Sequence, residues 1–458
     1  MTPVKKNDYL TATVEDYTHE GQGVVKVDGY PIFIPNVLKG EEIEFKVLKV
    51  NQKFGFGKSE KLLAPAANRI TPPCPYYYEC GGCQIQPLNY EEQQAFKKGT
   101  VDKSINRMGR LDRETMDVMA MENPFNYRNK SQIPVRFKDG RIEMGFYRPR
   151  SHSIVDIDNC IIQKDIHNRL MLFIKEQFNR EHVSVYDEAL HKGLVRHVVI
   201  RSNHDDSEVQ VAFVTNGKKN IFSNIIKEMI GAFPMVTSVV QNINDQKTNV
   251  IFGERTITLR GKDYITDTLL GKDFRIRAKS FYQVNHAQTE KLYQKAIELA
   301  DLQGDETIID TYCGIGTIGL CASDSARKII GIEVVQSAVE DAKENAKLNG
   351  VDNAEYHLGK SEQVMKKLVS EGVNPDVVFV DPPRKGCHPE FLESLVEVKP
   401  EKIIYVSCNP STLQRDLKYL NAEGYDISPV TPVDMFPQTN HIESVVMLEK
   451  NDHHMYSL

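Results

Sequence analysis

Four short apolar runs in the C-terminal half of the chain each end at a side chain that can do chemistry. Three of them end in the carboxylates of Asp310, Glu333 and Asp381, and the fourth, at 403–406, leads into Ser407-Cys408-Asn409-Pro410. A helical pattern follows the first run, and another spans 337–349. Alternating strands and helices predict a doubly wound α/β sheet, in which the carboxyl ends of the strands line the ligand crevice. We therefore expect three acids and one thiol along one edge of this sheet.

The turn after the first run contains the pattern G-x-G-x-x-G at 314–319. Gly314 and Gly316 allow a ligand to approach the backbone closely, and Glu333 can accept hydrogen bonds from both hydroxyls of a ribose. This pattern alone fits a nicotinamide dinucleotide or S-adenosylmethionine (SAM). A nicotinamide-dependent oxidoreductase would leave Cys408 and the Asp-Pro-Pro-Arg sequence at 381–384 without a shared task. We favour SAM and keep the oxidoreductase as an alternative, together with a catalytically inert RNA-binding protein.

A second group of cysteines has the spacing C-x5-C-x2-C, at Cys74, Cys80 and Cys83. Cys160 is the best candidate for a fourth member, because the other cysteines fall in the C-terminal part of the chain. Disulfides are not expected, since no apolar secretory segment is evident. Four thiolates can hold a structural zinc ion or an iron-sulfur cluster, and irregular spacing with one distant ligand is known for clusters.

The N-terminal 62 residues contain short apolar stretches broken by glycines, which predicts a small β-barrel. Such barrels present aromatic and basic side chains to nucleic acid. Phe33, Phe54 and Phe56 are candidates for stacking on bases, although Phe33 fits the core equally well.

The middle of the chain predicts an α+β domain. A helical pattern spans 90–108, strand-like runs lie at 197–201 and 208–214, and 248–258 is typical of a hairpin. The expected division is 1–62 for the barrel, 63–270 for the central domain with the four cysteines, and 271–458 for the C-terminal domain.

Charge gives a local signal only. The formal net charge is −6, but the stretch 128–150 holds seven basic residues against two acidic ones. The members of this basic stretch are Arg128, Lys130, Arg136, Lys138, Arg141, Arg148 and Arg150. They fit either contact with RNA phosphates or a solvated strand face.

The glycine turn, Asp381 to Gly386, Ser407 to Pro410, and Pro437-Gln-Thr-Asn-His-Ile-Glu443 together resemble the SAM-dependent RNA (uracil-C5)-methyltransferases. The resemblance covers nearly the whole chain and is greatest to the bacterial 23S rRNA branch. It implies a Rossmann-like SAM methyltransferase domain, and Glu20 to Val25 with Ile32 to Pro35 resembles an OB-like TRAM barrel. A tRNA T-loop uridine is the main rival substrate.

The chemistry of this family explains the residue types. Uracil C5 is too weak a nucleophile until a nucleophile adds at C6, and Cys408 can provide that thiolate. A base must then remove the C5 proton, and Glu443 is the candidate, although an acid ahead of an apolar strand is otherwise typical of a solvated surface. The resemblance assigns SAM contacts to Gln283, Tyr312, Glu333 and Asp381.

The resemblance also favours a [4Fe-4S] cluster on the four cysteines, with zinc as the alternative. The expected partner is RNA, with 23S rRNA first. No run is long and apolar enough for a membrane helix, so we expect a cytoplasmic protein without a membrane partner, and nothing indicates an obligate protein partner.

Overall fold

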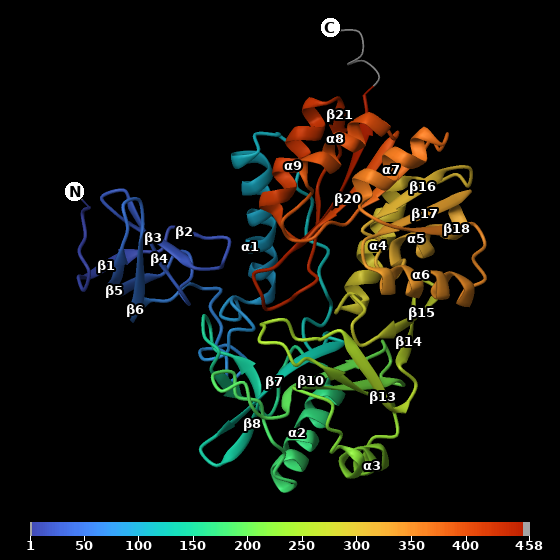
Figure 1. Ribbon diagram of the computed structural model, residues 1–458. Helices are drawn as coiled ribbons and strands as arrows, with labels where there is room; N and C mark the ends of the chain where they lie inside the picture. Colours follow the sequence, from blue (N-terminus) through green and yellow to red (C-terminus); the bar gives the residue numbers. More distant parts are fainter. Residues whose placement is uncertain (1, 452–458) are drawn as a thin grey trace.

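A computed structural model describes residues 2–451 of the chain and arranges their strands in four sheets (Figure 1). The first is a six-stranded sheet in the order β1-β5-β6-β4-β3-β2. Side chains alternate along its strands, so that Ile32 and Ile34 are buried while Phe33 faces outward. The strands are β1 Tyr9–Thr13, β2 Asp16–Tyr17, β3 Gly23–Val27, β4 Tyr30–Ile34, β5 Glu42–Val50 and β6 Gly55–Ala64.

The central part of the chain forms a seven-stranded sheet in the order β13-β12-β11-β10-β7-β8-β9. Helices α2 (Asp165–Arg180) and α3 (Ser223–Ala232) pack on one face, where Phe178, Phe213 and Phe222 form part of the core. This confirms the predicted α+β domain. The strands are β7 Lys130–Lys138, β8 Arg141–Tyr147, β9 Ile154–Asp156, β10 Val195–Ser202, β11 Val209–Thr215, β12 Val236–Ile243 and β13 Arg255–Gly261.

The hairpin predicted at 248–258 is wrong. The segment between β12 and β13 is an irregular loop, and β13 pairs with β12 instead. Two buried asparagines organise the loop: Asn244 donates to the carbonyls of Val250 and Ile251, and Asn242 binds Gly253. Polar side chains therefore replace the backbone pairs of a hairpin, a substitution that hydrophobic periodicity does not reveal.

The C-terminal part forms an eight-stranded sheet in the order β18-β17-β16-β19-β20-β23-β21, with β22 paired to β23. The strands β16 to β20 are parallel, and β23 runs antiparallel to β20. The strands are β16 Thr307–Thr311, β17 Lys328–Glu333, β18 Ala354–Leu358, β19 Val377–Val380, β20 Lys402–Ser407, β21 Tyr425–Ile427, β22 Thr431–Val433 and β23 Glu443–Lys450.

Helices cover both faces of this sheet and create two apolar cores, as a doubly wound fold requires. The strand order reverses between β16 and β19, and ligands bind at such a switch point. The predicted α/β architecture is confirmed. The helices are α4 His286–Ala300, α5 Thr317–Ala322, α6 Gln336–Leu348, α7 Ser361–Ser370, α8 Pro389–Val398 and α9 Pro410–Ala422, with a 3-10 turn at Ser323–Ser325.

Two further elements join these parts. Helix α1 (Tyr90–Asp102) begins at Asn89, whose side chain accepts from the Glu92 amide, and continues into a π-helical segment, Lys103–Met108. It lies between the N-terminal sheet and the eight-stranded sheet (Figure 1). The hairpin β14 (Tyr264–Leu269) and β15 (Lys272–Arg277) packs in the C-terminal core, and the predicted boundary at residue 270 falls in its turn. Within 2–451, no helix has the length and apolar character needed to cross a membrane.

Candidate active site

A cavity of about 680 Å³ opens at the carboxyl ends of β16, β19 and β20, where the strand order reverses. It is large enough for a nucleotide-sized ligand. All six side chains predicted for catalysis and SAM binding line it. They are Gln283, Tyr312, Glu333, Asp381, Cys408 and Glu443.

The glycine turn forms the floor of this cavity beside β16. Tyr312 has a φ of 57°, and Gly314 and Gly316 have φ values of 56° and 84°. A left-handed tyrosine is uncommon and marks a backbone held in a strained form, which is frequent at ligand sites. The Glu333 carboxylate accepts from the amides of Gly314 at 3.1 Å and Val334 at 2.8 Å. The glycine turn and the Glu333 carboxylate therefore hold each other in position through these backbone hydrogen bonds.

Cys408 lies in a strand-turn-helix corner between β20 and α9. Ser407 Oγ accepts from the Asn409 amide at 3.2 Å, and Asn409 Oδ1 accepts from the Ser411 amide at 3.0 Å. Asn409 also donates to the Arg384 carbonyl at 3.0 Å, which ties the corner to the loop after Asp381. Burial, with the nearby carboxyls of Glu443 and Asp381, raises the pKa of the Cys408 thiol to about 12.

Glu443 begins β23 directly beside this corner. Ser407 and Ser444 are register partners in the β20–β23 pair, so Cys408 and Glu443 follow at the same end of the two strands. Glu443 is only 4% exposed, and the alternative of a solvated surface acid is wrong. Burial and then the carboxyl of Asp381 raise the pKa of Glu443 well above its ordinary value, and burial raises that of Asp381 to about 7.

The segment that leads to Glu443 is held by α1, a contact that sequence reasoning missed. Lys97 Nζ lies 2.5 Å from Asp434 Oδ1 and donates to the Phe436 carbonyl, and both charged side chains are fully buried. Gln93 and Gln438 exchange two hydrogen bonds in the same region. These contacts join positions more than 300 residues apart, for which the sequence offers no local signal.

Asp310, His441 and Lys130 also line the cavity, without a predicted part in catalysis or SAM binding. Asp310 is buried, and burial raises the pKa of its carboxyl to about 7. His441 also lines the cavity, and burial lowers its pKa to about 4, so its imidazole is neutral at physiological pH. Lys130 approaches from β7 of the central sheet. The predicted sheet-edge position was the available signal for Asp310, and the basic stretch at 128–150 was the signal for Lys130.

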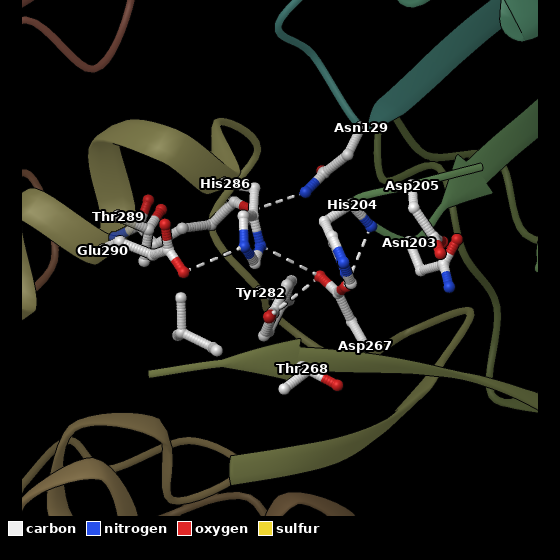
Figure 2. Close-up of polar contacts among 12 residues, drawn as sticks. Asn129, Asn203, His204, Asp205, Asp267, Thr268, Tyr282, His286, Thr289 and Glu290 are labelled. Atoms are coloured by element: carbon white, nitrogen blue, oxygen red, sulfur yellow. Dashed lines mark hydrogen bonds and ion pairs between the residues drawn. The ribbon is translucent and has the colours of Figure 1, made fainter. Parts of the chain in front are cut away.

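A polar network supports the segment that carries Gln283 (Figure 2). The buried Asp267 carboxylate accepts from Tyr282 Oη at 3.0 Å and from the His204 amide at 2.8 Å. His286 Nδ1 lies 3.3 Å from the same carboxylate, and the rings of His204 and His286 stack 4.9 Å apart. This network joins the central sheet, β14 and the start of α4 around Gln283.

The four predicted metal-ligating cysteines also come together, around a second cavity of about 230 Å³. Cys74, Cys80, Cys83 and Cys160 all line it, and Gly82 and Arg128 line both cavities. Among the residues that the structure describes, no three Cys, His, Asp or Glu side chains converge tightly enough for a single metal ion. The four thiols therefore lie around a cavity and do not converge on a single position.

Comparisons with known proteins agree with this geometry. Residues 210–451 match the family described as tRNA (Uracil-5-)-methyltransferase, and residues 3–59 match the TRAM domain. An uncharacterized RNA methyltransferase of Staphylococcus aureus (strain MSSA476) is 49% identical over 98% of this chain and 99% of its own length. One from Listeria innocua is 47% identical over 97% and 98% of the two chains.

A solved structure covers nearly the same length. The tRNA (uracil-54, C5)-methyltransferase of Pyrococcus abyssi, in complex with S-adenosyl-L-homocysteine, matches 96% of this chain and 100% of its own. The TM-score is 0.78 and the sequence identity 29%. These matches leave no support for the oxidoreductase alternative or for an inert RNA-binding protein. The chain belongs to the family of SAM-dependent RNA uracil-5-methyltransferases and carries an N-terminal TRAM domain.

Proposed function

We propose that this enzyme methylates C5 of a uridine in 23S rRNA, with Cys408 as nucleophile and Glu443 as base. The observation that carries the proposal is the position of these two side chains at neighbouring strand ends in one cavity. A thiol and a carboxyl in that arrangement suit addition to an unsaturated ring followed by proton removal.

The reaction begins when the Cys408 thiolate forms a bond to C6 of the uracil. The electron pair of the C5–C6 double bond then moves toward O4, and C5 becomes nucleophilic. SAM, when bound, supplies the methyl group that C5 takes up. Glu443 accepts the C5 proton, the C5–C6 double bond forms again, and the bond between Cys408 and C6 breaks.

The side chains around the glycine turn are proposed to bind SAM. Glu333 is oriented by backbone amides and suits the ribose hydroxyls. Tyr312 and Gln283 line the same cavity, and the Asp381 carboxyl, next to the Pro382-Pro383 corner, can lose its proton to face the sulfonium. Each of these roles can be tested by substituting the residue and measuring the affinity for SAM.

The TRAM domain and the central domain are proposed to hold the RNA. Phe33, Phe54 and Phe56 form a partly exposed cluster with ring centroids 5.4 to 5.9 Å apart, outside the barrel core. This placement supports base stacking. In the basic stretch, Arg136, Arg141 and Arg148 pair with acids of the protein, so fewer bases than predicted are available for phosphates.

We also propose a [4Fe-4S] cluster on Cys74, Cys80, Cys83 and Cys160. Thiols spread around a cavity of about 230 Å³ suit a cluster, in which each sulfur binds a different iron. A zinc ion, the alternative, would need all four sulfurs at about 2.3 Å. We assign the cluster a structural or RNA-contact role, because the methylation has no redox step.

A cytoplasmic location and a division into 1–62, 63–270 and 271–458 are parts of the same proposal, with the β14–β15 hairpin assigned to the last part because it packs in that core. In this division the two N-terminal parts bind RNA, and the last part carries out the transfer. The target uridine must leave its stack to reach Cys408, and flipping enzymes recover that cost through contacts with flanking nucleotides.

A tRNA T-loop uridine is the second candidate substrate. The observation that favours it is the match to the Pyrococcus abyssi enzyme, whose substrate is a tRNA uridine and whose whole length aligns with this chain. The TRAM domain and the four cysteines support 23S rRNA, because the bacterial tRNA enzymes of this family lack both.

The test uses 23S rRNA and tRNA transcripts that contain 5-fluorouridine, each incubated with the protein and radiolabelled SAM. Fluorine cannot leave C5 as a proton, so the enzyme should stay covalently bound to its true substrate during denaturing electrophoresis. A labelled adduct with 23S rRNA alone is expected. An adduct with tRNA alone would make tRNA the substrate in place of 23S rRNA. No adduct with either transcript would contradict the mechanism.

A further inference from the structure

One wall of the catalytic cavity carries two basic side chains that lack an acidic partner. Arg128 and Lys130 line the cavity from the start of β7. Burial and then the guanidinium groups of Arg201 and Arg128 lower the pKa of Lys130 to about 7. Among the described residues, no carboxylate forms an ion pair with Lys130. A lysine whose pKa lies near 7 and that has no counter-ion is typical of a binding site.

A third cation lies directly behind Lys130. Arg201 of β10 is the register partner of Lys130, so the two side chains share one face of the sheet. Arg201 is only 2% exposed, donates from Nη2 to the Ser280 carbonyl at 2.8 Å, and leaves Nε and Nη1 without a partner in the described structure. Like charges placed opposite each other are destabilising, and buried donors without partners are costly. Asp267 offsets part of the Arg201 charge, and an anion bound beside Lys130 would offset the remaining repulsion between the cations.

The cavity lining contributed by the C-terminal sheet holds four acids beside the basic side chain of Arg384. Its acids lie at the strand ends of the C-terminal sheet, at Asp310, Glu333, Asp381 and Glu443. SAM carries a sulfonium and an ammonium group against one carboxylate, so its net charge suits this acidic wall. The remaining reactant is the RNA, whose backbone has one negative charge per nucleotide and suits the basic wall.

The segment that carries Arg128 and Lys130 is also bound by hydrogen bonds to the segments that carry Gln283 and Glu443. Tyr127 Oη donates to the Pro437 carbonyl at 2.9 Å, in the segment that leads to Glu443. The Asn129 amide donates to the Val284 carbonyl at 2.8 Å, and its side chain donates to the Gln283 carbonyl at 3.0 Å. An anion bound here would be fixed in register with the proposed SAM contact and the proposed base, as catalytic positioning requires.

We propose that Lys130, with Arg128 beside it and Arg201 behind it, binds a phosphodiester of the RNA next to the flipped uridine. This site rests on the proposed function, because it positions the nucleotide that Cys408 attacks. Phosphate contacts of this kind fix register without reading sequence.

The test compares Lys130→Met with Lys227→Met, which removes the same charge from an exposed lysine of α3 on the opposite face of the same sheet. The RNA is the 23S rRNA or tRNA transcript that the wild-type enzyme methylates. Filter binding over a series of KCl concentrations gives the RNA affinity, and equilibrium dialysis gives the SAM affinity. Thermal unfolding checks that each variant is folded, and Lys130→Arg tests whether a positive charge restores binding.

For Lys130→Met we expect about tenfold weaker RNA binding and a slope of log K against log salt reduced by about 1. The SAM affinity and the melting temperature should not fall, because the substitution removes a like-charge pair. Lys227→Met should match the wild type. Weaker SAM binding with unchanged RNA binding would overturn the proposal and assign the cations to the SAM carboxylate. Unchanged affinity for both would also overturn it. A wild-type enzyme that methylates neither transcript would instead contradict the proposed function.

Discussion

The two cavities of this protein are built in different ways. The catalytic cavity is lined by side chains at the ends of β16, β17, β19, β20 and β23, whose positions follow from the register of one sheet. The four cysteines of the cysteine cavity lie outside named helices and strands, although Gln132 of β7 and Phe146 of β8 also line it. A sheet fixes its strand ends through backbone pairing, whereas segments outside helices and strands have fewer such bonds and open more readily unless a ligand holds them. The first cavity should therefore tolerate loss of its key side chain, and the second should not.

Both cavities hold neutral thiols. Burial raises the pKa of Cys83 to about 12 and that of Cys160 to about 11. Burial is also the main cause that raises the pKa of Cys408 to about 12. A thiol must lose its proton to ligate a metal or to attack a ring. Each cavity therefore needs a positive partner that favours the thiolate.

The largest expected effect is that of Cys408→Ala on activity. Methylation and the fluorouridine adduct should both fall below detection, because alanine at position 408 has no nucleophile to add to C6. The free energy of unfolding should change by less than about 1 kcal/mol, since Cys408 is partly exposed at a strand end. Activity is measured as transfer of label from SAM, and stability by urea unfolding. Residual methylation by this variant would contradict the proposed nucleophile.

Glu443→Gln should slow turnover by about 10² to 10⁴-fold, the usual contribution of a positioned base. Addition and methyl transfer come before the proton is removed, so a methylated covalent RNA adduct should accumulate on unmodified transcript. Denaturing gels with labelled SAM would show it. Fast turnover without an adduct would exclude Glu443 as the base. Glu298→Gln, at an exposed acid of α4 outside the cavity, is the matched control.

Cys83→Ser tests the other side of the comparison. If the cysteine cavity depends on its ligand, loss of one thiolate should remove iron and lower the free energy of unfolding by at least about 3 kcal/mol, because loss of a metal group is among the largest single-residue effects. Iron and sulfide content and thermal unfolding measure both changes. Cys321→Ser replaces a partly buried thiol of the C-terminal domain and should keep the metal. Unchanged metal content in Cys83→Ser would exclude this ligand.

The same difference explains how much the sequence could predict. Apolar periodicity located β17 at 328–333 and the strand before Cys408, and so placed both Glu333 and Cys408 at the sheet edge. The burial of Glu443 depends on antiparallel pairing with β20, and the Lys97–Asp434 pair depends on packing of α1. Neither contact leaves a local pattern. The hairpin prediction at 248–258 was wrong for the same reason, since side-chain hydrogen bonds organise that loop.

The network around Gln283 should give a smaller, pH-dependent effect. Asp267→Asn should cost about 2 kcal/mol, because buried hydrogen bonds lose a charged acceptor. Burial alone would lower the pKa of His286, but contact with Asp267 raises it above 6.5, and the pKa of Asp267 is lowered against the effect of burial by the two histidines. The contribution of His286 is therefore complete below pH 6.5 and is lost as the pH rises through its folded pKa. Urea unfolding at pH 6 and pH 8 should show the larger loss at pH 6, and an equal loss would remove the histidines from the network.

The smallest expected effect concerns the Cys408 thiol itself. With a pKa of about 12, its alkylation by iodoacetamide should rise about tenfold per pH unit between pH 7 and pH 9, because only the thiolate reacts. Two nearby carboxyls oppose the thiolate, so a cation bound against them should lower the thiol pKa by about 1 unit and speed alkylation about tenfold. SAM and S-adenosylhomocysteine have nearly the same shape and differ by the sulfonium charge, so only SAM should produce this increase. Mass spectrometry of the Cys408 peptide measures the rate, with Cys408→Ala as the blank. Equal acceleration by both compounds would mean that binding reshapes the corner, and the catalytic cavity would then depend on its ligand as the cysteine cavity does.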